Sequence, residues 1–195
     1  MAAITNAMAL YGTVIPFNAT FFVFSDYMKP SARIAALSGI QNFFIWTHDS
    51  IGVGEDGPTH EPIEHISQFR ALPNFYVWRP ADATENVEAW RTALTMQAPH
   101  GCVLSRQKLQ TLKPKRDFGD VSKGAYIVKK RKDANFTLMA SGSELMRCLK
   151  AACHLAVLGI KANVVSVPCL DLFNEQDAEY KAAVVDPNTK VLAVE

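Results

Sequence analysis

The run NFFIWTH, residues 42–48, decides the fold class of this chain. It is short, continuous in apolar and aromatic residues, and it ends at a histidine. Such a run is typical of a strand buried on both faces, as in a parallel sheet covered by helices. Three similar runs follow the same pattern: TVIPFNA (13–19), NFYVWRP (74–80) and GCVLSR (101–106).

Helical patterns alternate with these runs. Four helices are predicted, over 1–12, 21–37, 62–72 and 82–96. Alternation of strands and helices predicts a mainly parallel α/β sheet with right-handed crossovers.

The predicted helix 82–96 carries two local signals. Asp82 and Glu85 have the spacing of a capping box, in which each side chain binds the other residue's backbone amide. Val87, Trp90 and Leu94 recur at helical spacing and are predicted to form its apolar stripe.

The polar stretch LQTLKPKRDFGDVSK, residues 109–123, interrupts the alternation. We predict a linker at 113–122 that joins a unit over 1–112 to a second unit over 123–195. Ser141 and Glu144 again have capping-box spacing, and Gly159 is the predicted C-cap of the helix that follows. The second unit has predicted strands at 125–130, 136–141, 162–167 and 191–194, and helices at 143–158 and 175–185. The predicted fold is therefore two consecutive parallel-sheet α/β units.

Composition excludes several classes of function. The net charge of +1 offers no electrostatic basis for binding nucleic acid or an anionic membrane. The four cysteines are scattered without a CxxC motif, which favours reduced thiols and a cytoplasmic location. The first charged residue is Asp26, but the segment before it lacks a basic start and is broken by polar residues, glycine and proline, so a buried segment is expected.

Two residues, His48 and Arg106, follow predicted strands at the position where parallel α/β sheets bind ligands. His48 follows the run 42–48 at its end, and Arg106 follows the apolar part of 101–106. Ligands of parallel α/β sheets gather at the carboxyl ends of the strands, so both side chains are expected at one rim. An arginine there can bind a phosphate with two parallel hydrogen bonds, although a salt bridge to a neighbouring carboxylate is an equal alternative.

The stretch WTHDSIGVGEDGPTHEP, residues 46–62, brings His48, Asp56 and His60 together with three glycines. Glycines permit positive φ or close approach to a ligand. A surface loop, a metal site and a catalytic loop are the three interpretations. The metal site is disfavoured because the histidines of HEPIEH are five residues apart and do not share a helical face. No metal ligand is predicted in the chain.

Aromatic residues recur at Phe21, Phe24 and Tyr27. Core packing is the ordinary explanation for such a stripe, and Phe22, which points elsewhere, is predicted to belong to the core. The functional alternative is an aromatic wall for a flat heterocycle. His65, His100 and His154 have no chemical neighbours in the sequence and are expected to be structural.

Taken together, these motifs resemble the transketolase family. GEDGPTH is specific to that family, and the other motifs occur in the family's order. The resemblance covers the whole chain, as a pyrimidine-binding domain without its start and most of a carboxyl-terminal domain. The stretches that carry it are ATFFVFSDY (19–27), THDSIGVGEDGPTHEPIEH (47–65), WRPAD (78–82), LSRQ (104–107) and ASGSE (140–144).

The resemblance implies a thiamine diphosphate enzyme that transfers a two-carbon ketol unit from a ketose phosphate to an aldose phosphate. It implies that His48 and Arg106 contact the substrate phosphate, that Asp56 binds the C2 hydroxyl, and that His60 binds substrate and assists proton transfer. It also implies contacts to the cofactor's aminopyrimidine ring from Phe21, Phe24 and Tyr27.

Parts of the family's machinery are expected outside this sequence. The family's cofactor-activating glutamate precedes the position that matches Met1, and its diphosphate ligands and magnesium or calcium ligands lie on an amino-terminal domain. The chain is therefore expected to be a segment that is inactive alone and is completed in a homodimer or by an amino-terminal segment. The alternatives are a non-catalytic binding module of the same fold, or a related enzyme such as a deoxyxylulose phosphate synthase.

Overall fold

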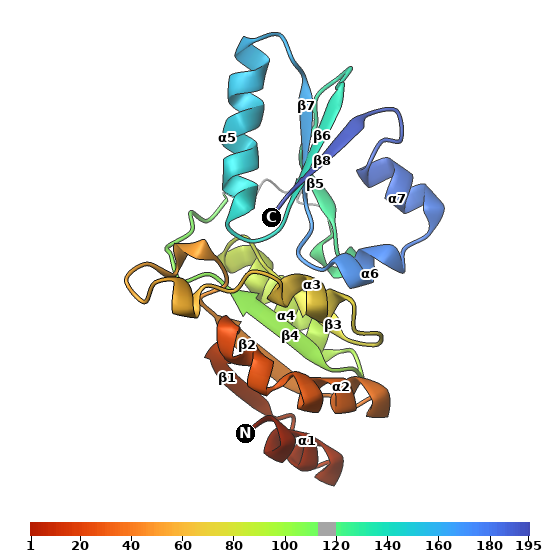
Figure 1. The fold of residues 1–195 in the computed structure, drawn as a ribbon. Helices are drawn as coiled ribbons and strands as arrows, with labels where there is room; N and C mark the ends of the chain where they lie inside the picture. Colours follow the sequence, from red (N-terminus) through yellow and green to blue (C-terminus); the bar gives the residue numbers. More distant parts are fainter. Residues whose placement is uncertain (113–119) are drawn as a thin grey trace. The chain divides into compact units, whose positions relative to one another are not determined.

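The structure is a computed structural model that describes residues 1–112 and 120–195. The chain forms two compact units, one of residues 1–78 and 90–108 and the other of residues 79–89 and 109–195 (Figure 1). Most of the predicted linker 113–122 lies outside the described residues, and its last part begins a short 3-10 helix, η4 (Val121–Lys123). The domain bounds 1–112 and 123–195 stay a prediction.

The first unit contains a fully parallel sheet of strand order β1-β2-β4-β3. Its strands are β1 (Phe17–Phe21), β2 (Phe43–Thr47), β3 (Tyr76–Trp78) and β4 (His100–Leu104). The helices along this part of the chain are α1 (Ala2–Tyr11), α2 (Lys29–Ser38), α3 (His65–Arg70) and α4 (Ala83–Leu94). The predicted parallel α/β architecture is confirmed for this unit.

Both faces of this sheet are covered, as the apolar run 42–48 predicts. Side chains alternate along a strand, so Phe44 and Trp46 point to one face and Phe43 to the other. Phe44 and Trp46 belong to the core that α1, α2 and α3 complete. On the opposite face Phe43 stacks on Trp90 of α4, with ring centroids 4.8 Å apart. Phe22 has no exposed surface, which confirms its predicted place in the core.

The single helix predicted over 21–37 is wrong. The strand predicted at 13–19 is shifted towards the carboxyl end of the chain, because β1 begins at Phe17 and ends at Phe21. A 3-10 helix, η1 (Phe22–Tyr27), follows, and a new α-helix begins at Lys29 with Pro30 in its first turn. Proline lacks an amide hydrogen and is accommodated only where that hydrogen has no helical partner, so it begins this helix rather than interrupting a longer one.

The buried face of α4 also differs from the prediction. Val87 and Leu94 are 57% and 48% exposed, so of the three residues of the predicted apolar stripe only Trp90, which stacks on Phe43, packs against the sheet. The buried positions are Glu85, Ala89 and Ala93, which follow one another at intervals of one helical turn. The backbone amide of Glu85 donates to Asp82 Oδ1 at 2.8 Å, as the capping box requires. The Glu85 carboxylate accepts from the Ala81 amide instead of the Asp82 amide.

The second unit contains a mixed sheet of strand order β5-β7-β6-β8. Its strands are β5 (Tyr126–Lys129), β6 (Phe136–Ala140), β7 (Ala162–Ser166) and β8 (Lys190–Val194). Strands β6, β7 and β8 are parallel, but β5 is antiparallel to β7, so the prediction holds only for the majority of the pairs. The short connection from β5 to β6 leaves no room for a crossover helix, and a parallel pair needs one.

Helices cover both faces of the second sheet. The helix α5 (Glu144–Val157) lies on one face and α6 (Leu170–Asn174) and α7 (Ala178–Val184) lie on the other (Figure 1). Leu138 of β6 packs with α5, whereas Met139 packs in the cluster that contains Phe173 and Val184. The helix predicted over 175–185 is therefore α7 alone, and α6 was not predicted.

The capping box predicted at Ser141 and Glu144 is wrong. The N-cap of α5 is Ser143, and its side chain makes no capping hydrogen bond. The buried guanidinium of Arg79 occupies this corner, with Nη1 2.6 Å from Glu144 Oε2 and 3.1 Å from the Ser141 carbonyl oxygen. Arg79 therefore binds the side chains of Ser141 and Glu144, which in a capping box would have bound backbone amides instead. Gly159, the predicted C-cap, lies one residue beyond the C-cap Leu158, with φ 76°.

Glu85 should make the second unit less stable as the pH rises. Burial is the main cause that raises the pKa of this carboxyl above its ordinary 4.5, although Ser166, Tyr126 and the Ala81 amide donate hydrogen bonds to it. The folded state thus holds a proton that the unfolded state has released, so stability is full below pH 4.5 and falls as the pH rises through the folded pKa. Denaturant unfolding between pH 4 and 8 should show a steeper fall for wild type than for Glu85→Gln, and equal slopes would contradict this.

His100 should have the opposite effect in the first unit. Its ring has no exposed surface, stacks on Phe43 with centroids 5.1 Å apart, and accepts a hydrogen bond from Trp78 Nε1 at 3.2 Å. Burial lowers the pKa of this imidazole from 6.5 to about 4. Its contribution to stability is present above pH 6.5 and is lost as the pH falls towards about 4, a loss on the order of 3 kcal/mol.

The titration of His100 can be followed directly. An NMR titration should show the His100 ring unprotonated at pH 5.5, well below the ordinary imidazole pKa of 6.5. A midpoint for His100 near 6.5 would contradict the burial argument.

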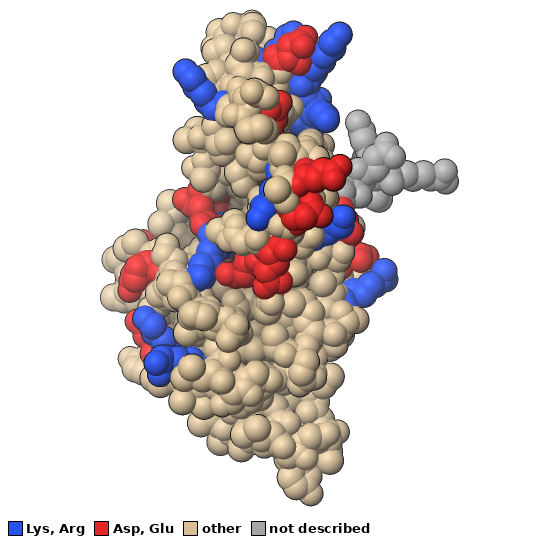
Figure 2. Space-filling view, turned by 90° about the vertical axis from the view of Figure 1, so that its right-hand side faces the viewer, with Lys and Arg blue, Asp and Glu red and all other residues tan. Residues whose placement is uncertain are grey.

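The helix α1 carries no charged side chain. The lower end of the face drawn in Figure 2, where α1 lies, shows neither Lys or Arg nor Asp or Glu, in agreement with a first charged residue at Asp26. Apolar side chains are exposed there, including Ile4 at 64% and Tyr11 at 81%. Within the described residues, no helix has both the length and the apolar character that a membrane span requires.

Candidate functional site

The carboxyl ends of three parallel strands meet at one rim of the first sheet. Phe21, Thr47 and Leu104 are the last residues of β1, β2 and β4, and they lie side by side in the register of the sheet. His48 follows Thr47 directly, and Arg106 lies two residues after Leu104. The structure therefore places His48 and Arg106 at the same rim, as the strand-end rule predicts.

Phe21 joins the aromatic residues to this rim. Its ring stacks on the His48 ring with centroids 3.6 Å apart. Phe24 and Tyr27 follow on η1, and their rings stack with centroids 6.3 Å apart. In a 3-10 helix residues three apart eclipse one another, so Phe24 and Tyr27 share one face without the drift of an α-helix. Tyr27 is 84% exposed, so this aromatic set is a surface wall and not ordinary core packing.

His60 lies against the same wall. Its ring is edge-on to Phe24 at 5.4 Å and to Phe21 at 6.3 Å. It belongs to a 3-10 turn, η3 (Pro58–His60), and its Nδ1 is 2.8 Å from the hydroxyl of Thr59. The structure thus brings His48 and His60, twelve residues apart in sequence, into contact with the same ring, that of Phe21.

His48 is held in a similar way. Its Nδ1 is 2.9 Å from the Thr47 hydroxyl, and its backbone has φ 61°, a conformation that few residues other than glycine adopt. Such backbone strain is common at functional sites. With Nδ1 of each histidine bound to the preceding threonine, Nε2 makes no hydrogen bond to any residue that the structure describes and can meet a ligand.

The glycine-rich loop lies over Arg106. A Cβ at Gly54 would be 3.5 Å from the Arg106 Cζ, and one at Gly52 would be 2.8 Å from Gln107 Oε1. Gly54 has φ 85° and Gly57 has φ 72°, so the loop uses conformations that side chains disfavour. The loop and Arg106, predicted separately, therefore belong to one site.

Asp56 is the predicted residue that the structure connects least. It is exposed on the same loop, and its carboxylate makes no hydrogen bond or ion pair with residues 1–112 or 120–195. Its backbone carbonyl accepts a long hydrogen bond from Thr59 at 3.5 Å. The side chain is therefore available to a ligand but has no partner that fixes its direction.

Asp49 was missed by the sequence reasoning. It is 3% exposed and accepts a hydrogen bond from the Ser105 hydroxyl at 3.2 Å, which fastens the end of β2 to the end of β4 beneath the rim. The signal was present in the sequence, because Asp49 is the second residue after β2 and Ser105 is the first residue after β4. The pairing of β2 with β4 had to be known before this contact could be predicted.

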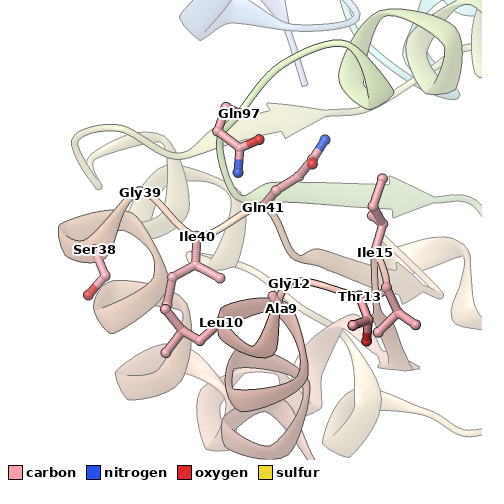
Figure 3. Close-up of a pocket in the computed structure, with 11 residues that line it drawn as sticks. Ala9, Leu10, Gly12, Thr13, Ile15, Ser38, Gly39, Ile40, Gln41 and Gln97 are labelled. Carbon is pink, nitrogen blue, oxygen red and sulfur yellow. The ribbon is translucent and has the colours of Figure 1, made fainter.

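A pocket of about 390 Å³ lies elsewhere in the first unit (Figure 3). It is lined by the ends of α1 and α2 and by the residues that precede β1, β2 and β4, among them Ile15, Gln41 and Gln97. These positions are at the amino ends of the strands, so the pocket lies at the opposite edge from the rim. It contains none of the predicted site residues.

The rim combines a stacking surface, two histidines with available Nε2 atoms, a carboxylate and a guanidinium. These groups can bind a flat ring, donate and accept protons, and hold an anionic, hydroxylated ligand. The fold and the rim define an α/β protein with a ligand-binding site at the carboxyl ends of its first sheet.

Comparisons with known proteins identify the family. Residues 1–111 match the transketolase pyrimidine binding domain, and residues 124–195 match the transketolase-like C-terminal domain. The chain belongs to the transketolase family.

The relatives agree with this assignment over the length of the chain. A transketolase from Cereibacter sphaeroides is 49% identical over 187 residues, which are 95% of this chain and 28% of that protein. The crystal structure of a Campylobacter jejuni transketolase matches with a TM-score of 0.95 and 57% identity, over all of this chain and 30% of that one. A Pichia stipitis transketolase solved in complex with sedoheptulose 7-phosphate matches with a TM-score of 0.95 and 40% identity, over all of this chain and 29% of that one. The chain thus spans about three tenths of the length of these relatives.

Proposed function

We propose that this chain forms the substrate-contacting part of a transketolase, which transfers a two-carbon ketol unit from a ketose phosphate to an aldose phosphate. The observation that carries the proposal is the packing of both His48 and His60 on Phe21, at the rim that also carries Arg106. The names of the relatives support transketolase over a deoxyxylulose phosphate synthase or a non-catalytic module.

Each side chain of the rim has a proposed role. The Arg106 guanidinium, which is exposed beside Gly54, binds the substrate phosphate together with His48. The free carboxylate of Asp56 accepts a hydrogen bond from the C2 hydroxyl. His60 binds substrate and moves a proton at the reacting oxygen, because its Nε2 is free while Thr59 holds Nδ1.

The aromatic wall fits the aminopyrimidine ring of thiamine diphosphate. Phe21 and Phe24 are half-buried and Tyr27 is exposed, so a flat ring can lie against them without displacing core residues. When bound, the cofactor supplies the carbanion chemistry that breaks and forms the carbon–carbon bond. Its diphosphate and the magnesium or calcium ion are proposed to bind outside this chain, on the amino-terminal part of the enzyme.

A second polypeptide surface is proposed to complete the site, either in a homodimer or from an amino-terminal segment. The chain spans about three tenths of its relatives' length, and the uncharged surface of α1 exposes apolar side chains such as Ile4 and Tyr11. Burial of such a surface against another chain is favourable. We also propose a cytoplasmic location, supported by four cysteines that form no disulfide within the described residues.

The reaction class can be tested with this chain joined to the amino-terminal part of a related transketolase. With thiamine diphosphate, magnesium, a ketose phosphate and an aldose phosphate, mass spectrometry should show an acceptor lengthened by two carbons. Pyruvate offered as the donor tests the alternative, because a deoxyxylulose phosphate synthase would release carbon dioxide from it. Efficient use of pyruvate, with no transfer from the ketose phosphate, would overturn the proposal.

A further inference from the structure

A second cluster of polar side chains lies beside the aromatic wall. Asp26 stands on η1 between Phe24 and Tyr27, and Glu64 and His65 stand at the start of α3. One potential ligand atom from each of Asp26, Glu64 and His65 lies within 4.8 Å of the others. None of these three residues was expected to bind a ligand, and the roles proposed for the rim do not use them.

One pair of these atoms already has the spacing of two metal ligands. His65 Nε2 lies 3.4 Å from Asp26 Oδ1. In a tetrahedral zinc site with bonds of about 2.0–2.2 Å, neighbouring ligand atoms are about 3.3–3.6 Å apart. Glu64 Oε2 lies 3.8 Å from the other ring nitrogen, Nδ1. Because the Glu64 side chain is 68% exposed, it can rotate towards the same position without disturbing the core.

The buried histidine supplies an independent observation. His65 is only 4% exposed, and its ring packs on Phe22 with centroids 5.5 Å apart. Neither ring nitrogen makes a hydrogen bond within the described part of the chain. Buried polar groups are nearly always hydrogen-bonded, so a buried imidazole that faces two carboxylates without such a bond requires an explanation.

Simple ion pairing explains this arrangement less well. At 3.4 Å and 3.8 Å, the contacts are longer than the charge-assisted hydrogen bonds of a protonated histidine, which are about 2.7–2.9 Å. The nearby cation Lys29 donates to Gln68 Oε1 at 2.6 Å, and Gln68 Nε2 in turn lies 3.4 Å from Asp26 Oδ1. Gln68 thus approaches the same oxygen that faces His65, and a carboxylate oxygen with two lone pairs can accept this long hydrogen bond and still bind a metal.

We propose that Asp26, Glu64 and His65 form a zinc site. A mixed set of imidazole and carboxylate ligands suits zinc better than magnesium or calcium, which prefer oxygen ligands alone. Three protein ligands leave a fourth position for water. The ion would connect η1, which carries Phe24 and Tyr27, to the chain just after His60, and would thereby stiffen the aromatic wall.

Zinc titration of the whole chain by calorimetry tests this site, with cobalt as a spectroscopic substitute. We expect one dominant site, with visible absorption bands of tetrahedral cobalt. His65→Gln and Asp26→Asn should each weaken binding by more than about 10-fold, the cost typical of losing even a supporting contact. His154→Gln, which removes an exposed histidine of the second unit, should leave the affinity unchanged.

Binding that is absent, or that is equal in wild type, His65→Gln and Asp26→Asn, would overturn the proposal. So would binding that is lost in His60→Gln and kept in His65→Gln, because the metal would then be at the rim. If His65→Gln fails to fold, Asp26→Asn and Glu64→Gln decide the question, since these side chains are 54% and 68% exposed. Circular dichroism of each variant establishes that it is folded.

Discussion

Replacing His60 by alanine in the completed enzyme should lower kcat by about 100-fold or more, the usual contribution of a positioned acid–base group. The reason lies in how the ring is held. Phe21 and Phe24 both make T-shaped contacts with it, Thr59 binds Nδ1, and the free Nε2 is left for the reacting oxygen. A group held in this way loses little conformational freedom in the transition state, so its removal should appear in kcat more than in KM.

The matched control is His154→Ala. His154 is an exposed histidine of the second unit, and its removal should leave kcat unchanged. Thermal unfolding of both variants shows whether the fold is kept. A His60→Ala enzyme with the kcat of wild type would reject the proposed role of His60.

Arg106→Ala should raise KM for phosphorylated substrates by about 10- to 100-fold, because hydrogen bonds to a charged group contribute about 1.5–3 kcal/mol. The guanidinium is exposed at the rim beside Gly54, so the phosphate would exchange water for two parallel hydrogen bonds. Arg106→Lys should recover only part of the loss, since an ammonium cannot form that planar pair.

Unphosphorylated sugars separate phosphate binding from a general defect. Their KM should change little in Arg106→Ala, and Lys108→Ala, two residues along the same exposed segment, should behave as wild type with both substrate classes. Equal losses with phosphorylated and unphosphorylated sugars would argue against phosphate binding by Arg106.

The rim could be predicted from the sequence because it depends on a general property of parallel sheets. The runs that became β2 and β4 are nearly continuous in apolar residues, and parallel strands bring their carboxyl ends to one edge. His48 and Arg106 could therefore be placed together without knowledge of the loops. The roles of these two residues, and of Asp56 and His60, came from the family resemblance and stay predictions.

Other features depended on contacts between segments far apart in the sequence. Phe24 and Tyr27 share one face because η1 is a 3-10 helix, and the apolar pattern of 21–37 does not distinguish it from an α-helix. Asp49 meets Ser105, and Asp26 meets His65, only after the fold has formed. Local capping rules failed at Ser141 because Arg79, from a distant segment, binds there.

The ketol transfer rate of this chain, measured alone and joined to an amino-terminal transketolase segment, tests the central proposal most directly. Both forms are assayed with thiamine diphosphate, magnesium and the same pair of sugar phosphates. We expect no measurable transfer by the chain alone and transfer at a rate comparable to an intact transketolase by the joined protein. Full turnover by the chain alone would contradict the proposal that its rim is one part of a shared site, and a folded joined protein without transfer would contradict the proposed function.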